Sequence, residues 1–210
     1  MSVVTKQPSV NRVIIHGASW ETYESLMKDL ENRNSPRLAF DAGVLEIMTT
    51  SSEHEGCNRI LSSIVEITLE ELGMDFMNLG QTTFKRDDLK KGFEPDSCFY
   101  IQSVRKIRGK KRIDMKFDPP PDLLIEVDFS SGSLNKFRIY AAIGVPEVWR
   151  YEDSLEIWLL EKDRYVKAET SIALPVVTPK FISGLVEISK TLEKPQWIRL
   201  TRDRIRARIK

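Results

Sequence analysis

The run from Asp122 to Asp128 restricts the fold more than any other feature, because every residue inside it except Glu126 is aliphatic. A nearly continuous apolar run of this length is typical of a central β-strand that is covered on both faces. An ionised carboxylate within such a strand costs several kcal/mol unless a cation or hydrogen bonds compensate it. We therefore expect an α/β protein built around this strand, with a positive group near Glu126.

Composition supports one globular unit. The chain has 210 residues, of which 41% are hydrophobic and 30% charged, enough to bury one sizeable core. We predict a single domain over residues 1–210, with a core from about 20 to 190 and a basic C-terminal tail from about 198 to 210.

No run approaches the roughly 20 apolar residues of a membrane helix, and the N-terminus lacks an apolar signal segment, so we expect a cytoplasmic protein with no membrane partner. Cys57 and Cys98 are too few for a disulfide framework and should be reduced.

Hydrophobic periodicity and turn residues predict the order of the elements. The expected elements are a short strand or linker at 12–16, a helix at 20–30, a hairpin at 37–48, a helix at 54–72, strands at 76–84, 96–101 and 122–128, a helix at 134–143 capped by Ser133 and ended by Gly144, a strand at 146–151 and a hairpin at 155–167. A charged turn is expected at 85–92 and a basic excursion before about 121. A right-handed crossover would make the strands at 122–128 and 146–151 parallel, in a mixed central β-sheet flanked by helices with additional β-hairpins.

Two other residues are candidates for chemistry at Glu126. Lys136 falls in the first turn of the following helix, where a cation opposes the helix dipole by a few tenths to about 1 kcal/mol, so its position suggests a purpose. Asp96 opens the preceding strand, and a neighbouring strand about 4.8 Å away would bring its carboxylate to the same sheet face as Glu126. Asp96 and Glu126 together could hold one Mg²⁺, a hard ion with open water positions that suits phosphodiester hydrolysis. Lys136 would orient the attacking water or stabilise the developing negative charge. A purely structural Glu126–Lys136 ion pair is the alternative.

Distance sorts the remaining acidic residues. Asp122 would lie about 13 Å from Glu126 along the strand, too far to share a metal, and is assigned to the strand start. Asp128 would be about 6.6 Å away on the same face and is a secondary ligand candidate. His54 and Glu55, at a helix start, are further secondary candidates, although the helix dipole alone favours Glu there. Three aromatic residues have core-like spacing and are assigned to packing rather than base stacking: Phe137, Tyr140 and Trp149.

The net charge of +1 neither demands nor excludes a polyanionic partner, so nucleic-acid binding would depend on local basic patches. The candidates for nucleic-acid binding lie in one glycine-containing segment: Arg105, Lys106, Arg108, Lys110, Lys111 and Arg112. A second patch in the tail comprises Arg202, Arg204, Arg206 and Arg208. A solvated loop and a solvated tail are equally compatible with these patterns.

Several segments occur in a specific joint spacing. They are Gly43–Met48, Ser52–Glu55, Glu94-Pro95-Asp96, Pro121–Val127 and Lys136–Trp149. Together they resemble the bacterial Uma family, whose members are described as restriction endonucleases. The resemblance covers roughly residues 20 to 190.

This resemblance implies a restriction-endonuclease-like fold of the PD-(D/E)xK superfamily, a Mg²⁺ cofactor and DNA as the substrate. Asp96 then matches the first acid, Glu126 the second, and Lys136 a lysine moved from the strand onto the helix; Asp128 stands where the usual motif has Lys. We therefore expect a Mg²⁺-dependent DNA endonuclease, with Mn²⁺ as a substitute ion, acting as a homodimer because two strands are cut. The alternatives are a catalytically inactive nucleic-acid-binding or interaction module on the same fold, and a metal-dependent hydrolase of another phosphate ester.

Overall fold

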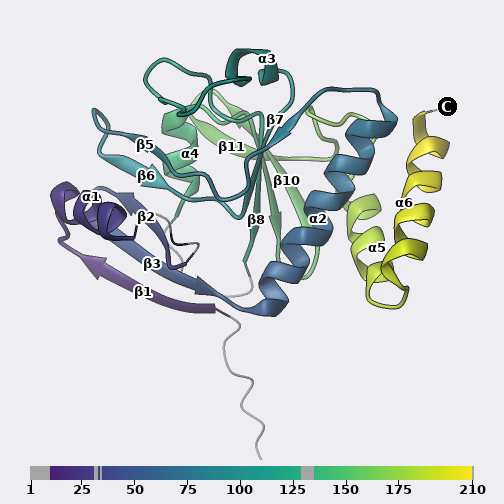
Figure 1. Cartoon of the computed structure of the whole chain (residues 1–210), viewed down its shortest axis with the longest axis horizontal. Coiled ribbons are helices and arrows are strands. Elements are labelled where there is room, and N and C mark those ends of the chain that lie inside the picture. Colours follow the sequence, from purple (N-terminus) through teal and green to yellow (C-terminus); the bar gives the residue numbers. More distant parts are fainter. Residues whose placement is uncertain (1–9, 31–32, 34, 129–134, 210) are drawn as a thin grey trace, which may run out of the picture.

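Two β-sheets and six helices make up the described part of the chain, which in the computed structural model comprises residues 10–30, 33, 35–128 and 135–209 (Figure 1). The five-stranded sheet is antiparallel throughout, in the order β1-β3-β2-β6-β5. Its strands are β1 (Val10–His16), β2 (Arg37–Asp41), β3 (Val44–Thr50), β5 (Phe84–Arg86) and β6 (Lys91–Phe93). Helix α1 (Trp20–Asp29) packs on one face of this sheet through Trp20 and Tyr23.

The six-stranded sheet is mixed, in the order β11-β10-β9-β8-β7-β4. Its strands are β4 (Met77–Asn78), β7 (Ser97–Tyr100), β8 (Leu123–Val127), β9 (Glu147–Tyr151), β10 (Leu155–Glu161) and β11 (Arg164–Ala168). The other helices are α2 (Ser52–Glu71), α3 (Val104–Ile107), α4 (Phe137–Ile143), α5 (Pro179–Ser189) and α6 (Lys194–Ile209). Among the described strands, β8 and β9 are the only parallel neighbours, as predicted from the crossover between them.

Strand β8 is the interior strand that its aliphatic run predicts. Leu123, Ile125 and Val127 belong to the core cluster formed with α2, α5 and α6, whereas Leu124 packs on the opposite face with α4. Side chains alternate between the faces of a strand, so Glu126 lies on the α4 face. Helix α4 ends at Gly144, whose φ of 86° is left-handed, as predicted for a glycine terminator. The predicted cap Ser133 lies outside the described residues.

Two predictions between α2 and β7 are wrong. The strand expected over 76–84 is reduced to β4, and the charged turn expected over 85–92 contains the hairpin β5–β6, which belongs to the five-stranded sheet. The buried side chains of this hairpin are Phe84 and Phe93, and most of its other residues are charged. Charged residues are common on edge strands, and in the sequence they resemble a turn. Gly92 is required there, because a Cβ at this position would overlap the hydroxyl and ring of the buried Tyr23.

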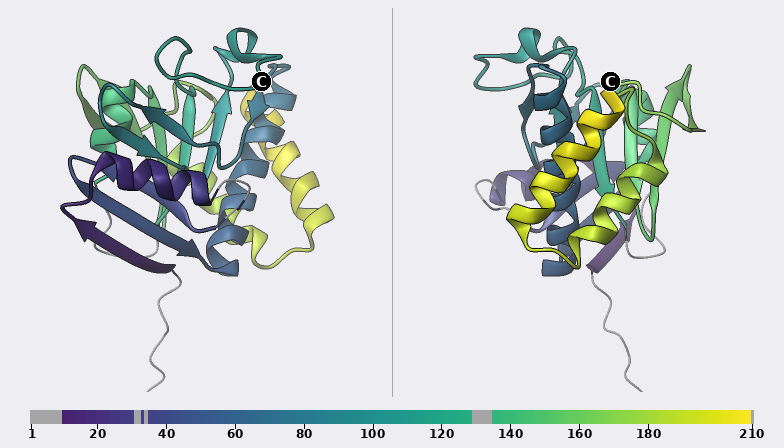
Figure 2. Two further views of the ribbon diagram at one scale, coloured as in Figure 1. Left: turned by 60° about the vertical axis from the view of Figure 1, so that its left-hand side comes forward. Right: turned by 90° about the vertical axis from the view of Figure 1, so that its right-hand side faces the viewer.

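The prediction of a basic tail from about 198 is also wrong. These residues belong to α6, which lies beside α2 and α5 (Figure 2). Trp197, Thr201 and Ile205 are fully buried at four-residue spacing, and Arg202 and Arg206 form ion pairs with glutamates of α2. The apolar stripe of this helix is so narrow that the charged residues dominate its sequence. Within the described residues, no helix combines the length and apolar character needed to cross a membrane.

Candidate active site

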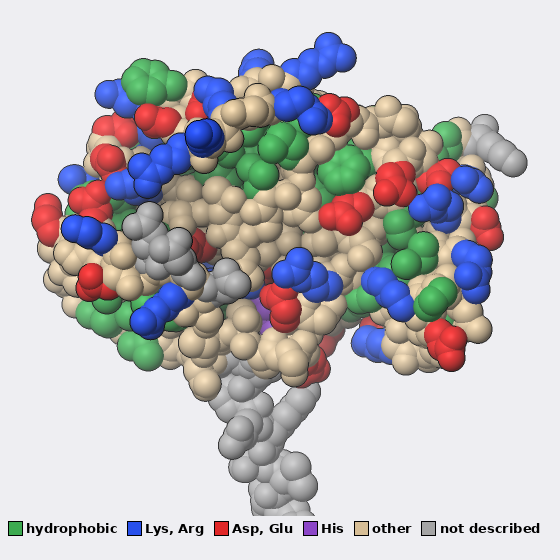
Figure 3. Space-filling view, in the orientation of Figure 1, with side chains coloured by type: hydrophobic (Ala, Val, Ile, Leu, Met, Phe, Trp, Pro, Cys, Tyr) green, Lys and Arg blue, Asp and Glu red, His purple; other side chains and the backbone are tan. Residues whose placement is uncertain are grey.

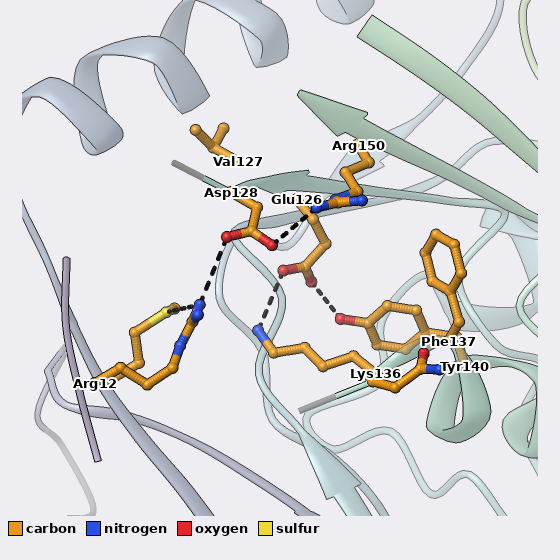
Figure 4. A pocket seen from close by; sticks show the side chains of 10 residues that line it. Arg12, Glu126, Val127, Asp128, Lys136, Phe137, Tyr140 and Arg150 are labelled. Carbon is orange, nitrogen blue, oxygen red and sulfur yellow. Dashed lines mark hydrogen bonds and ion pairs between the residues drawn. The ribbon is translucent and has the colours of Figure 1, made fainter. Parts of the chain in front are cut away.

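A cavity of about 310 Å³ opens at the C-terminal end of β8 (Figure 4). The charged residues that line it come from separate elements. Glu126 lies in β8, and Asp128 directly follows this strand; Lys136 directly precedes α4. Arg150 lies in β9, and Arg12 lies in β1. The pairing of Arg12 with Met48 places the Arg12 side chain on the same face of the five-stranded sheet as Glu46 and Met48. The cavity therefore lies where the two sheets face each other.

Glu126 is held by two donors on the α4 side. Its Oε1 accepts a hydrogen bond of 2.6 Å from the Tyr140 hydroxyl, and its Oε2 lies 3.3 Å from Lys136 Nζ. Lys136 Nζ is also 3.7 Å from Glu46 Oε1, so the ammonium sits between two carboxylates. Burial and the adjacent Glu126 hold the pKa of Tyr140 well above its usual range, which keeps its hydroxyl protonated as a donor. The structure thus brings Glu126 and Lys136 together as expected, and adds Tyr140, which the sequence had assigned to packing.

Asp96 is the most enclosed of the three predicted active residues. Only 1% of its surface is exposed, and its Oδ1 forms an ion pair with Arg37 of β2. Its Oδ2 accepts a hydrogen bond of 2.6 Å from the backbone N–H of Val127. Because Ser97 pairs with Ile125, continuing the register places Asp96 opposite Glu126. Asp96 therefore stands beside Glu126 in the sheet, but its carboxylate is directed at Arg37 and the β8 backbone.

His54 fixes the same end of β8. Its Nε2 lies 2.6 Å from the carbonyl oxygen of Val127 and 3.2 Å from Asp96 Oδ2. Burial lowers the pKa of His54 to about 4, and the charge of Arg37 acts in the same direction, so the imidazole is neutral near pH 7. Since both neighbours of Nε2 are acceptors, Nε2 carries the proton. Glu55, the residue after His54, instead contacts Arg37 at 3.4 Å and Arg59 at 2.7 Å.

Asp128 lies between two arginines. Its Oδ1 is 3.7 Å from Arg12 Nη2, and its Oδ2 is 3.4 Å from Arg150 Nη2 (Figure 4). Neither arginine had been selected from the sequence. Arg12 and Arg150 occupy strands whose local patterns carry no functional signal, and only the pairing of β1 with β3 and of β8 with β9 brings them to Asp128.

The basic segment selected from the sequence lies at the other end of β8. Asp122, just before β8, accepts hydrogen bonds from the backbone N–H groups of Ile101 and Ser103, which anchor the start of α3 there. Arg108 pairs with Asp75, and Lys110 with Asp118, whereas the other four basic residues are exposed: Arg105, Lys106, Lys111 and Arg112. Lys and Arg side chains gather along this edge of the molecule (Figure 3). The structure does not bring them to the cavity.

The carboxylate oxygens near the cavity are ligands that a hard divalent cation prefers, but in this conformation they do not form a complete metal site. Among the described residues, no three His, Cys, Asp or Glu side chains are grouped so that they could hold a metal ion. Glu126 presents its carboxylate to the cavity, whereas Asp96 would have to leave Arg37 in order to join it. Glu126 thus fits a metal ligand directly, and Asp96 fits one after a side-chain rearrangement.

The fold places the chain among restriction-endonuclease-like proteins. A crystal structure from Anabaena variabilis, described as "a putative nuclease belonging to DUF820", matches with a TM-score of 0.53 and 12% sequence identity, covering 80% of this chain and 98% of that chain. The family model for Uma2, described as "Putative restriction endonuclease", matches residues 20–189. The chain belongs to the Uma2 family. No curated protein matches it.

Proposed function

We propose that this protein is a Mg²⁺-dependent DNA endonuclease with an active centre of Asp96, Glu126 and Lys136. The observation that carries the proposal is the 3.3 Å contact between the Lys136 ammonium and the Glu126 carboxylate at the cavity, inside the segment that matches a nuclease family. An acid and an amine in contact at an accessible cavity are the groups that metal-assisted phosphodiester hydrolysis requires.

The metal would be held by Glu126 with Asp96 as the second ligand, and Mn²⁺ would substitute for Mg²⁺. When bound, such an ion lowers the pKa of the attacking water and offsets negative charge on the leaving oxygen. His54 supports this centre by fixing Asp96 and the end of β8. Glu55 contributes through Arg37, which contacts both Glu55 and Asp96.

The chain's own residues would orient and stabilise. Tyr140 and Lys136 contact one oxygen each of Glu126, which fixes the direction in which this carboxylate faces the cavity. The side chain of Lys136 is only 10% exposed, so its charge is weakly screened and acts strongly on negative charge that develops on a phosphate. In the usual motif a lysine stands at the position that Asp128 occupies here. The Lys136 ammonium would supply the amine that is missing from this position.

Nicking of supercoiled plasmid tests the proposal. The wild type should relax the plasmid with Mg²⁺ or Mn²⁺ and should stop when EDTA is added. Glu126→Gln and Lys136→Met should each lower the rate at least a hundredfold, whereas the matched exposed substitutions Glu169→Gln and Lys162→Met should change it less than twofold. A wild type that never nicks with either ion, or a Glu126→Gln variant of full activity, would overturn the proposal.

A second candidate function is a nucleic-acid-binding module without turnover. It is favoured by the engagement of both Asp96 oxygens, one by Arg37 and the other by Val127. In this case wild type and Glu126→Ala would bind a fluorescent DNA duplex equally well, and neither would nick plasmid. Gln substitutions at Arg105, Lys106, Lys111 and Arg112 would test whether the basic edge contributes to that binding. Homodimer formation, proposed for double-strand cutting, is tested by light scattering.

A further inference from the structure

Asp128 occupies an unusual position for a carboxylate at the edge of a candidate nuclease cavity. The two guanidinium groups that flank it come from different sheets, Arg12 from β1 and Arg150 from β9, and all three residues line the cavity. Their contacts of 3.7 and 3.4 Å are longer than the roughly 2.7–2.9 Å of a close charge-assisted hydrogen bond. The two arginines are therefore near an anion without being tightly bound to it.

Arg12 has donor capacity that the described residues do not use. Its side chain is only 11% exposed, and its Nε lies 3.2 Å from Glu46 Oε2. Its Nη1 is buried and has no hydrogen-bond partner among the described residues. A buried donor without an acceptor costs about 1–3 kcal/mol, so the arrangement favours a ligand that brings an oxygen into the cavity.

A phosphodiester has the chemistry that this arrangement accepts. It carries one negative charge over two non-bridging oxygens, and guanidinium groups bind such oxygens with directed N–H donors. Figure 4 shows Arg12, Arg150 and Lys136 converging on the cavity from three sides, next to Glu126. A phosphate at this place would contact the arginines while lying beside the Glu126–Lys136 pair.

We propose that Arg12 and Arg150 bind the non-bridging oxygens of a nucleic-acid phosphodiester, and that Asp128 holds the two guanidinium groups in its absence. The proposal rests on the proposed nuclease function and adds to it the residues that bind the phosphate. Asp128 then acts as an internal competitor: the substrate anion must replace its contacts with Arg12 and Arg150. Arg12 lies outside the family-matched segment 20–189, so this part of the site is supplied by β1.

Because Asp128 and the phosphate compete for the same arginines, substitutions of Arg150 and of Asp128 should change the affinity for DNA in opposite directions. Arg150→Gln should weaken binding of a DNA duplex about tenfold, the loss of one charge-assisted contact. It should also reduce the slope of log K against log salt concentration by about 0.9, the contribution of one phosphate contact. Asp128→Asn should strengthen binding several-fold, because it removes the competing carboxylate. A general loss of folding would weaken binding in both variants, so it cannot mimic this pair of results.

Binding is measured by fluorescence anisotropy of a labelled 16-base-pair duplex over a series of KCl concentrations, with EDTA present so that cleavage does not interfere. Arg164→Gln, an exposed substitution on β11, is the matched control for the lost charge. Because Arg12 is paired with buried Glu46, Arg12→Lys is used in place of Gln, and circular dichroism verifies its fold. We expect Arg12→Lys to bind several-fold more weakly, since an ammonium lacks the planar donor fork.

A second probe separates this inference from the proposed function. Calorimetric titration with inorganic pyrophosphate measures the anion site without requiring a nuclease. If the wild type nicks plasmid but Arg150→Gln behaves like Arg164→Gln, the inference is overturned and the nuclease function stands. If no nicking occurs but pyrophosphate binds and Arg150→Gln abolishes this binding, the anion site stands and the nuclease function is overturned. Absence of both DNA and pyrophosphate binding would overturn the inference, as would an Asp128→Asn variant that binds no more tightly than the wild type.

Discussion

At the scale of single residues, Glu126 shows how far a sequence can identify a site. A carboxylate within an aliphatic run requires compensation, and this requirement, together with the place of Lys136 at the start of the following helix, pointed to Lys136, which lies 3.3 Å away. It could not point to Tyr140, because a tyrosine on an apolar helix face has the same spacing whether its hydroxyl meets a carboxylate or solvent. The hydrogen bond from Tyr140 depends on how α4 packs against β8, which no local pattern records.

Removing the Tyr140 hydroxyl tests its role as a residue that positions Glu126. We expect Tyr140→Phe to lower the plasmid-nicking rate roughly 10- to 100-fold, as is usual when a hydrogen bond to a metal ligand is lost. Tyr165→Phe is the matched control, because it loses a hydrogen bond of the same length, 2.6 Å, from its hydroxyl to the Val145 carbonyl oxygen. Equal losses of activity in the two variants would mean that Tyr140 acts only through packing.

The cysteines provide a test with a defined pH dependence. Burial raises the pKa of the Cys57 thiol to about 11 and that of Cys98 to about 12, so less of each exists as the reactive thiolate at any given pH. At pH 8, the folded protein should react with a thiol reagent roughly a hundredfold more slowly than its urea-unfolded form. The rate should rise about tenfold per pH unit between pH 7.5 and 9.5. Rapid labelling of the folded protein at pH 8 would contradict this expectation.

At the scale of elements, the sequence predicts best where local chemistry sets the ends of an element. The Ser19 and Ser51 hydroxyls cap α1 and α2, each accepting a hydrogen bond from the backbone N–H group three residues ahead, and Gly144 ends α4 in the left-handed conformation. Prediction fails where burial is sparse: β5 and β6 each bury few side chains, and α6 hides a narrow apolar stripe among arginines. Only their packing partners in β2 and α2 reveal them as regular elements.

Helix α6 yields a prediction that distinguishes a packed helix from a solvated tail. Trp197 is fully buried, and its indole N–H donates a hydrogen bond of 2.8 Å to the Leu185 carbonyl oxygen of α5. We expect Trp197→Ala to lower the free energy of unfolding by about 3–5 kcal/mol, measured by urea denaturation. Arg206→Gln, which removes an exposed ion pair with Glu71, should cost less than about 1 kcal/mol. Similar small effects for both substitutions would indicate a tail that does not pack.

At the scale of the whole molecule, the candidate site is assembled where the two sheets face each other. Arg12 and Arg37 come from the five-stranded sheet, whereas their partners Asp128 and Asp96 directly adjoin β8 and β7 of the other sheet. The sequence predicted that Asp96, Glu126 and Lys136 lie on neighbouring elements, because Asp96 begins the strand before that of Glu126 and Lys136 begins the helix after it. It gave no information on Arg12 and Arg37, because the relative placement of two sheets depends on long-range packing.

The ion pair between Arg37 and Asp96 should therefore stabilise the contact between the sheets as well as the site. Both side chains are almost fully buried, with exposures of 4% and 1%, so removing one leaves an uncompensated charge. We expect Arg37→Met and Asp96→Asn each to lower the free energy of unfolding by about 3–5 kcal/mol. The double variant should lose less than the sum by about 1–3 kcal/mol, because it leaves no unpaired charge. The same cycle on the exposed pair Arg108 and Asp75 should give a coupling below about 1 kcal/mol. Additive losses at Arg37 and Asp96 would show that the sheets are held together without this ion pair.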